Sequence, residues 1–320
     1  GLMGDLIGLI AKRLSFGVLT LLVISVLIFM GTEALPGDLA EAILGQSATP
    51  DALAAIREKL NLNLPSHERY VIWLSSFLQG DLGVSLANGR EISSLISGRF
   101  ANTLFLASVA AAVSVPLSVT LGLMAALYQG SIFDRVVSMA TLSTISFPEF
   151  FIGYVLIVFL SVQFSVFPSI SSVTDDMSFF EKLYAIALPV MTLTLVVMAH
   201  MMRLSRAAII SILNRPFIEM AELKGLSRFR VIVHHAFPNA LAPIINVVVL
   251  NLAYLVVGVI IVEVVFVYPG MGQLFVDSVS KRDLPMVQAC GLIFAGTYVL
   301  LNLTADVLSI ITNPRLRYPK

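Results

Sequence analysis

Long apolar runs alternate with short polar stretches along this chain, and six of the runs are long enough to cross a bilayer. A helix needs roughly 20 apolar residues to cross about 30 Å of hydrocarbon. Because no water reaches that depth, the backbone has to satisfy its own hydrogen bonds, which favours helices. The pattern therefore predicts an all-α polytopic membrane protein with six transmembrane helices, at residues 14–32, 103–127, 136–160, 184–202, 240–266 and 286–311.

The segment between the first two predicted spans, residues 33–100, is the one sizeable region that is not expected to cross the membrane. Its pattern predicts a helix at 51–60, a break at Pro65, an amphipathic run at 70–77 and turns at Gly80, Gly83 and Asn88-Gly89. Its apolar content argues against disorder. We expect three regions: an N-terminal segment with the first span (1–32), an extracytoplasmic subdomain (33–100) and a five-helix core (101–320).

Composition supports the membrane class and excludes others. Hydrophobic residues make up 58% of the chain and charged residues 12%, far from the roughly 25% charged residues of soluble domains. The mean hydropathy is +0.92. The partner implied is the lipid bilayer. A net charge of zero gives no electrostatic basis for binding nucleic acid, and a single cysteine, Cys290, excludes an internal disulfide.

Basic residues set the expected orientation, because cytoplasmic loops of membrane proteins carry an excess of Lys and Arg. With a cytoplasmic N-terminus, twelve basic residues face the cytoplasm and three fall in short outer loops; five more lie in 33–100, a segment too long to report on topology. We therefore expect both termini in the cytoplasm. The twelve are Lys12, Arg13, Arg135, Arg203, Arg206, Arg215, Lys224, Arg228, Arg230, Arg315, Arg317 and Lys320, against Lys182, Lys281 and Arg282 outside.

A polar, basic island at 214–239 separates the fourth and fifth predicted spans. Asn214 can act as an N-cap, and Pro216 suits a first helical turn, where the missing N–H costs nothing. Gly225 is expected to end this helix in a left-handed conformation. Ser227 can cap a second short helix, which Pro238 is expected to break. The island thus predicts two short helices on the cytoplasmic side.

One face of the first of these helices is small and apolar. Phe217, Met220, Ala221 and Lys224 recur at helical spacing, and Glu219 lies near the positive end of the helix dipole. Such a face fits a groove on another protein. An amphipathic helix lying on lipid headgroups is the alternative, and the spacing leaves both open.

The spacing of the island resembles a known element. Glu219 and Ala221 form Glu-x-Ala, Gly225 follows the Glu by six residues, and Pro238 follows the Gly by thirteen. This resembles the EAA loop of ABC importer permeases, through which a membrane subunit grips a separate ATPase. The ATPase-coupling residues implied by the resemblance are Phe217, Glu219, Met220, Ala221, Glu222, Lys224, Gly225 and Pro238.

The resemblance extends over nearly the whole chain. The motifs that carry it are Pro36-Gly37-Asp38, Leu60-Asn61-Leu62-Asn63-Leu64-Pro65, Gly80-Asp81-Leu82-Gly83, Arg203-Leu204-Ser205-Arg206-Ala207, Glu263-Val264-Val265-Phe266, Pro269-Gly270-Met271-Gly272 and Asn313-Pro314-Arg315. In this order they are similar to the dipeptide and oligopeptide (DppB/OppB-type) ABC importer permeases. The chain departs from that pattern at Asn61 and Asn63, where Gly and Asp are usual, and at Glu219 and Glu222, where Arg is common.

The resemblance implies a type I ABC importer permease fold in a bacterial plasma (inner) membrane. It implies four kinds of partner: a second related permease subunit in a heterodimer, two ATPase subunits, an extracytoplasmic solute-binding protein and the lipid bilayer. No cofactor is expected in this chain, since the ATPase subunits bind ATP and Mg. The transported class implied is di- or oligopeptides, although relatives of this fold also take nickel complexes, glutathione or oligosaccharides.

Polar residues inside the predicted spans are costly and therefore mark candidate sites. Glu149 follows Pro148, which frees backbone carbonyls in the third span. Adjacent His234 and His235 point to different helix faces and have no acidic or Cys neighbour at ligand spacing, so no metal site is expected. Candidate translocation-path residues are Ser146, Glu149, Met198, Asn246 and Asn251.

A second group of polar residues is expected to be structural or gating: Glu263, Arg282 and Asp306. Glu263 can pair with Arg282 or cap the turn at Pro269-Gly270. Asp306 lies at the inner end of the last span, where an ion pair with an Arg or a hydrogen bond between helices is expected.

The motifs that the chain lacks narrow its mechanism. It contains no phosphate-binding loop, no nucleophile elbow and no zinc-type His-Glu-x-x-His, so we expect a transport subunit and not an enzyme. A proton- or sodium-coupled secondary transporter that uses Glu149, Glu263 or Asp306 is the alternative. It predicts internal inverted repeats, which the sequence does not display. A membrane-embedded enzyme predicts a catalytic constellation, which is missing.

Overall fold

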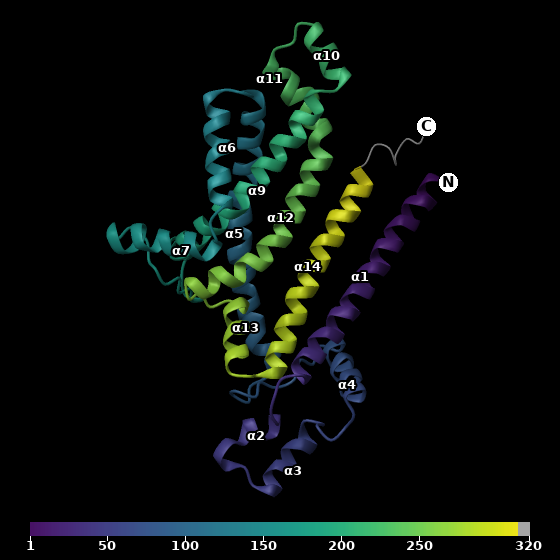
Figure 1. The fold of residues 1–320 in the computed structure, drawn as a ribbon, viewed down its shortest axis with the longest axis vertical. Coiled ribbons are helices and arrows are strands. Elements are labelled where there is room, and N and C mark those ends of the chain that lie inside the picture. Colours follow the sequence, from purple (N-terminus) through teal and green to yellow (C-terminus); the bar gives the residue numbers. More distant parts are fainter. Residues whose placement is uncertain (313–320) are drawn as a thin grey trace.

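The computed structural model describes residues 1–312, and the regular structure in that range is helical (Figure 1). Five helices are long and apolar enough to cross a membrane: α1 (Leu2–Glu33), α5 (Ile92–Leu127), α9 (Ala187–Leu213), α12 (Phe237–Val265, entered from Arg228) and α14 (Leu284–Thr312). The predicted all-α membrane fold is confirmed. Arg315, Arg317, Lys320 and the motif that begins at Asn313 lie outside the described residues.

The third predicted span, 136–160, is not one straight helix. It consists of α6 (Ile132–Ile145) and α7 (Glu149–Leu156), which is continued by the π-helical segment η2 (Ile157–Gln163). The two parts are bent by 105°. Pro148 explains the break, because its ring clashes with the preceding turn and its nitrogen has no hydrogen to donate. Six spans result only when this bent pair counts as one.

Two helices extend well past the hydrocarbon that the apolar pattern marks. α5 has 36 residues and begins at Ile92, inside the segment expected to lie outside the membrane. At 1.5 Å per residue it is about 54 Å long, against a hydrocarbon thickness of about 30 Å. α9 continues to Leu213, where residue 202 was the expected end. A helix extends as far as its backbone hydrogen bonds continue, in lipid or in water. Hydropathy therefore predicts the part of a helix that lies in the membrane and not the residues at which the helix ends.

α5 and α9 pack at close range through small residues. A Cβ added at Gly122 would lie 3.0 Å from the carbonyl oxygen of Met202 and 3.1 Å from the amide nitrogen of Arg206. Ala110, Ala125 and Ala126 on the same helix are also buried. Close backbone approach of this kind is how helices associate in lipid, where the hydrophobic effect between them is absent.

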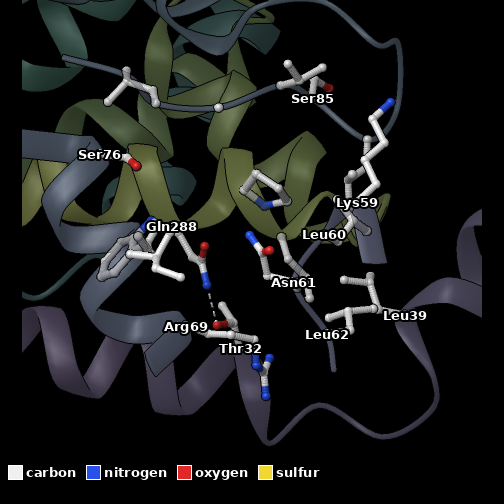
Figure 2. Close-up of a pocket in the computed structure, with 18 of the residues that line it drawn as sticks. Thr32, Leu39, Lys59, Leu60, Asn61, Leu62, Arg69, Ser76, Ser85 and Gln288 are labelled. Atoms are coloured by element: carbon white, nitrogen blue, oxygen red, sulfur yellow. Dashed lines mark hydrogen bonds between the residues drawn. The ribbon is translucent and has the colours of Figure 1, made fainter. Parts of the chain in front are cut away.

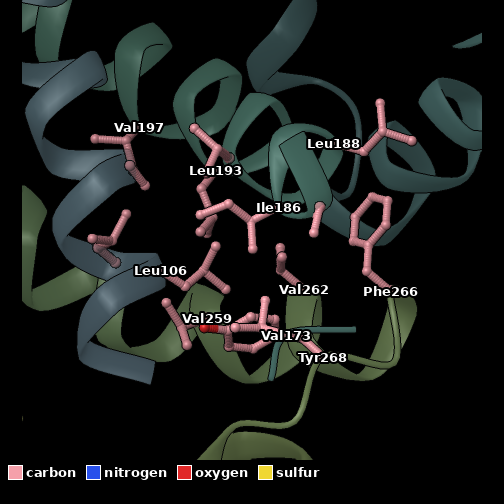
Figure 3. Packing of buried hydrophobic residues seen from close by; sticks show 14 of the residues in the cluster. Leu106, Val173, Ile186, Leu188, Leu193, Val197, Val259, Val262, Phe266 and Tyr268 are labelled. Atoms are coloured by element: carbon pink, nitrogen blue, oxygen red, sulfur yellow. The ribbon is translucent and has the colours of Figure 1, made fainter. Parts of the chain in front are cut away.

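We call the end of the bundle that holds residues 214–239 the inner end and the opposite end the outer end, after the orientation that the basic residues predict. A hydrophobic cluster joins α5, α9 and α12 toward the outer end (Figure 3). Leu106 of α5, Leu193 of α9 and Val259 of α12 are almost completely buried in it. Phe266 and Tyr268, from the turn that follows α12, are fully buried in the same cluster. The three helices are therefore fixed to one another near their outer ends.

Most of the short helices lie at the two ends of the bundle, whereas α7 projects to one side of it (Figure 1). At one end, beside the start of α1, lie α10 (Pro216–Leu223), α11 (Arg228–Arg230) and the π-helical η3 (Val231–Ala236). The opposite end carries α2 (Leu39–Leu44), η1 (Gly45–Ser47), α3 (Pro50–Lys59), α4 (Ser66–Leu78) and α13 (Met271–Ser280), and α8 (Phe179–Ala185) precedes α9.

The segment 33–100 folds against the bundle through α4. The Ser25 hydroxyl of α1 and the Tyr70 hydroxyl of α4 are 2.7 Å apart, and Phe29 packs on Tyr70 and Trp73. The helix expected at 51–60 is present as α3, one residue earlier. The expected turns are present as well, since Gly80, Gly83 and Gly89 all have positive φ.

Candidate functional site

The helix at the inner end of the bundle, α10, owes its start to Pro216 at the first helical position. Proline restricts the residue before it to extended conformations. Arg215 accordingly has φ −83° and ψ 151° and takes the N-cap position, whereas Asn214 is the C-cap of α9. The expectation that Asn214 caps α10 is therefore wrong. Glu219 lies in the first turn.

Gly225 reverses the chain after α10. Its φ is +82°, a conformation in which a side chain is strained, and the space around its missing Cβ is open. Ser227 then caps the next helix, with its hydroxyl accepting a hydrogen bond from the Arg230 amide at 3.3 Å. The extended backbone at Arg215 and the left-handed backbone at Gly225 thus set the direction in which α10 points.

α10 has one buried face and one exposed apolar row. Ile218 and Ala221 are buried against Ile209, Ile212 and Val231. The expected outward face is therefore wrong for Ala221, because Ala221 shares the buried side of the helix with Ile218. The exposed residues are Phe217, Glu219, Met220, Glu222, Leu223 and Lys224, with Met220 61% and Leu223 81% exposed.

Pro238 does not break the chain where a break was expected. η3 runs directly into α12, so helical backbone continues from Arg228 to Val265. The wider turns of a π-helix use i→i+5 bonds and are typical of places where an extra residue is accommodated in a helix. Pro238 stands in the first turn of the α-helical part, where a missing N–H is tolerated.

A cavity of about 530 Å³ lies in the middle section of the bundle, between α7, α9 and α12. Glu149, the first residue of α7, reaches into it from the break after Pro148. Asn251 of α12 also lines it and donates to the Val247 carbonyl at 2.8 Å. Three other candidate path residues do not line this cavity: Ser146, Met198 and Asn246. The Ser146 hydroxyl instead bonds the Leu142 carbonyl at 3.0 Å.

Glu263 is completely buried at the outer end of α12. It accepts hydrogen bonds from the Thr103 hydroxyl at 2.7 Å, the Gly272 amide at 2.7 Å and the Gln273 amide at 3.2 Å. It therefore caps the first turn of α13, after Pro269-Gly270. Among the ion pairs of the described residues, none joins Glu263 to the exposed Arg282.

The network around Glu263 continues through neighbouring groups. The Thr103 hydroxyl accepts from the Met271 amide at 2.8 Å, and the Tyr268 hydroxyl donates to the Asn102 carbonyl at 2.6 Å. Burial raises the pKa of the Tyr268 phenol, which keeps it a hydrogen-bond donor. Asp306, at the other end of the bundle, lies 3.8 Å from Arg13 of α1, and both side chains are partly exposed.

A family model described as "Binding-protein-dependent transport system inner membrane component" matches residues 118–318, which hold α10 and both polar sites above. A second model, "Binding-prot-dependent transport system membrane comp, N-term", matches residues 6–107. The chain belongs to this family. It is a multi-pass membrane subunit of a binding-protein-dependent transport system, a transport component and not an enzyme. The permease works with separate ATPase subunits, which hydrolyse the ATP, and with a solute-binding protein.

Individual relatives match the permease over nearly its whole length. "Probable peptide ABC transporter permease protein y4tP" of Sinorhizobium fredii is 34% identical over 97% of this chain and 99% of its own. "Glutathione transport system permease protein GsiC" of Escherichia coli is 35% identical over 97% of this chain and 98% of its own. The GsiC protein of Salmonella typhi is 34% identical over the same shares.

A second cavity of about 530 Å³ lies at the outer end of the permease, between α1, the segment 33–100 and the start of α14 (Figure 2). Gln288 of α14 donates to the Thr32 hydroxyl at 2.7 Å on one wall. Lys59 and Arg69 lie on other walls, and Arg69 forms an ion pair with Glu33. Asn61, which departs from the family pattern, also lines this cavity. The departure therefore falls at the end of the bundle opposite α10.

Sequence reasoning missed three groups beside Glu149: His200 of α9, and Tyr254 and Gly258 of α12. His200 and Tyr254 are polar residues in apolar runs and could have been noticed. Gly258 gives no polar signal, and its role follows only from which helix lies opposite it. No set of three or more His, Cys, Asp or Glu side chains gathers into a metal site in the part of the chain that the structure describes.

Proposed function

We propose that this permease imports peptides, pairs with a second related permease, and is driven by two ATPase subunits, one of which receives α10 in a groove. The observation that carries this proposal is the exposed apolar row of Phe217, Met220 and Leu223, supported from beneath by the buried Ile218 and Ala221. A helix that is firmly seated on one side and apolar on the other suits a groove in a partner.

The basic residues at the same end of the molecule support an orientation in the membrane. α10 and the start of α1 lie at one end of the bundle (Figure 1), and Lys12, Arg13, Arg215, Lys224, Arg228 and Arg230 gather in these segments. The positive-inside rule puts this end in the cytoplasm, where ATP is present. Both termini are then cytoplasmic, and the segment 33–100 faces the solute-binding protein.

Peptide as the transported class rests on the relatives, whose names specify peptide and glutathione transport. Glutathione is itself a peptide-like molecule with an amino group and carboxylates. The exposed membrane face of α12, with Leu250, Tyr254, Val257 and Ile261, supports the pairing with a second permease, because it borders the cavity beside Glu149. A partner on this face would enclose the cavity.

The test is purification of the intact complex from its native membrane, with wild type compared to Met220→Asp and Leu223→Asp. We expect both variants to reach the membrane at normal level and to lose the ATPase subunits, since a charge in an apolar groove is costly. Ile132→Asp is the matched control, because Ile132 is as exposed as Leu223 but lies at the start of α6.

The wild-type complex in proteoliposomes, with its solute-binding protein, should take up trialanine only when ATP is supplied. Retention of the ATPase subunits by both α10 variants would contradict docking through this row. Uptake that follows a proton or sodium gradient without ATP would instead support the secondary-transporter alternative.

A further inference from the structure

We infer that the cavity beside Glu149 is a transit subsite for a cationic amino group of the cargo, and that the Glu149 carboxylate contacts this group. The inference rests on the importer function proposed above and identifies the part of the peptide that the membrane subunit itself recognises.

Glu149 is a hydrogen-bond acceptor whose donor is not supplied by the fold. Its Oε1 atom is enclosed and receives no hydrogen bond from any residue that the structure describes. A buried carboxylate oxygen without a donor is costly to maintain. Glu263, the other buried carboxylate discussed above, has three donors within 3.2 Å. The contrast indicates that Glu263 completes the fold, whereas Glu149 is completed by a group that enters the cavity.

The walls of the cavity provide no cation of their own. Neither Lys nor Arg lines it, and its polar side chains other than Glu149 are the neutral or weakly basic groups of His200, Asn251 and Tyr254. Within this chain no cation balances Glu149, and a cationic ligand can supply one. A metal ion is a poor match, because a second carboxylate is missing from the lining. An ammonium group offers three donors and suits one carboxylate together with neutral acceptors.

The opposite wall leaves room for the carboxylate. A Cβ added at Gly258 would lie 2.9 Å from Oε1 and 3.1 Å from Oε2 of Glu149, so a side chain at 258 would displace the acid. Asn251 donates one amide hydrogen to the Val247 carbonyl, and no described residue donates to the side-chain oxygen of Asn251, which is a second acceptor for an ammonium. A volume of about 530 Å³ falls within the range of small-ligand pockets.

The test compares two peptides in proteoliposomes that contain the intact complex, ATP and a saturating amount of its solute-binding protein. Trialanine has a free amino terminus, and N-acetyl-trialanine lacks the charge. We expect Glu149→Gln to slow the uptake of trialanine about tenfold, the value of one charge-assisted hydrogen bond, and to leave the uptake of the acetylated peptide at the wild-type rate. The same binding protein delivers to both complexes, so its own preference cancels in the ratio of variant to wild type.

Two further variants sharpen the comparison. Gly258→Ala should reproduce the selective loss, because it displaces the carboxylate without removing it. Glu181→Gln is the matched control, since Glu181 is exposed on α8 and lines neither cavity. It should leave both uptake rates unchanged.

An equal slowing of both peptides by Glu149→Gln would mean that the residue only maintains the structure, and unchanged uptake of trialanine would mean that it contacts no amino group; either result overturns the inference. Where wild type does not import the acetylated peptide, thermal unfolding of the complex without binding protein gives the answer. Millimolar trialanine should raise the Tm of wild type and not of Glu149→Gln, and equal shifts would overturn the inference. Absence of ATP-driven uptake by wild type would instead contradict the proposed importer function.

Discussion

The turn that follows α12 at the outer end and the helix α10 at the inner end are stabilised in different ways. The outer turn is held by buried side chains: Glu263 and Thr103 together bond the amides of Met271, Gly272 and Gln273. In the part of the chain that the structure describes, no side chain of α10 makes a hydrogen bond or ion pair. α10 is held by two buried apolar residues and by its helix ends.

This difference teaches how a surface is kept available for another protein. Polar groups that satisfy one another rigidify a structure and present nothing to a partner. Side chains that are left exposed cost little in water and can bond or pack once the partner arrives. The outer turn therefore sets the geometry of the bundle, and α10 keeps its side chains for binding.

The largest effect is expected at the outer turn. Glu263→Ala leaves three buried donors without an acceptor and should lower the free energy of unfolding by about 3–5 kcal/mol. Thermal unfolding of the purified protein in detergent measures this. Glu181→Ala, at an exposed position on α8, serves as the control. A Glu263→Ala protein with the Tm of wild type would contradict the claim that buried side-chain hydrogen bonds stabilise the outer turn.

A second outer contact should give a smaller effect. Asp283 is buried, forms a hydrogen bond with the Ser85 hydroxyl and accepts from the Leu86 amide at 3.0 Å, which fastens the loop 84–90 to the start of α14. Asp283→Ala should cost about 1–3 kcal/mol, since the buried Ser85 hydroxyl and the partly buried Leu86 amide lose their acceptor. If this loop contacts the solute-binding protein, ATPase stimulation by that protein should fall while basal ATPase activity remains. Unchanged stimulation of the ATPase activity would mean that the loop 84–90 only packs against the bundle.

At the inner end, Gly225→Val should strain the left-handed turn by about 1–2 kcal/mol and redirect α10. We expect a variant that is present in the membrane at normal level and fails to couple ATP hydrolysis to uptake in proteoliposomes. Gly98→Val is the control, because Gly98 has no positive φ and open space around it. Full coupled uptake by the Gly225 variant would show that the direction of α10 does not matter.

The smallest effect is expected at Asp38, which caps α2 and pairs with Arg57 of α3. The hydrogen bond from Arg57 lowers the pKa of the Asp38 carboxyl below its ordinary value of 3.8. A depressed pKa means that the stabilisation is present above the ordinary pKa and is lost as the pH falls below it. The protection factors of residues 39–59 against hydrogen exchange, which correct for the intrinsic rate at each pH, should therefore fall below about pH 4. Asp38→Asn should show weaker protection that does not change in this pH range.

The sequence predicted the spans, the short helix α10 and the turn at Gly225 because each depends on local pattern or on one residue with special backbone freedom. It did not predict the bend at Pro148, since proline within an apolar run can mark either a kink or a break. The sequence also could not predict the hydrogen-bond partners of Glu263. Two partner readings were open, and the choice between Arg282 and the amides after Gly270 depends on how α12 and α13 meet. Ala221 was misplaced because helical spacing alone does not say which face is buried.

The bend between α6 and α7 has a consequence for how the protein is made. α6 has 14 residues and rises about 21 Å, which is less than the thickness of the hydrocarbon. When residues 132–163 leave the ribosome, α9 and α12 have not yet been synthesised, and the Gly258 wall that faces Glu149 does not exist. The nascent segment can satisfy its backbone in lipid only as a more continuous helix. We therefore expect the bent form to arise at a late step of membrane assembly, after α12 has been inserted.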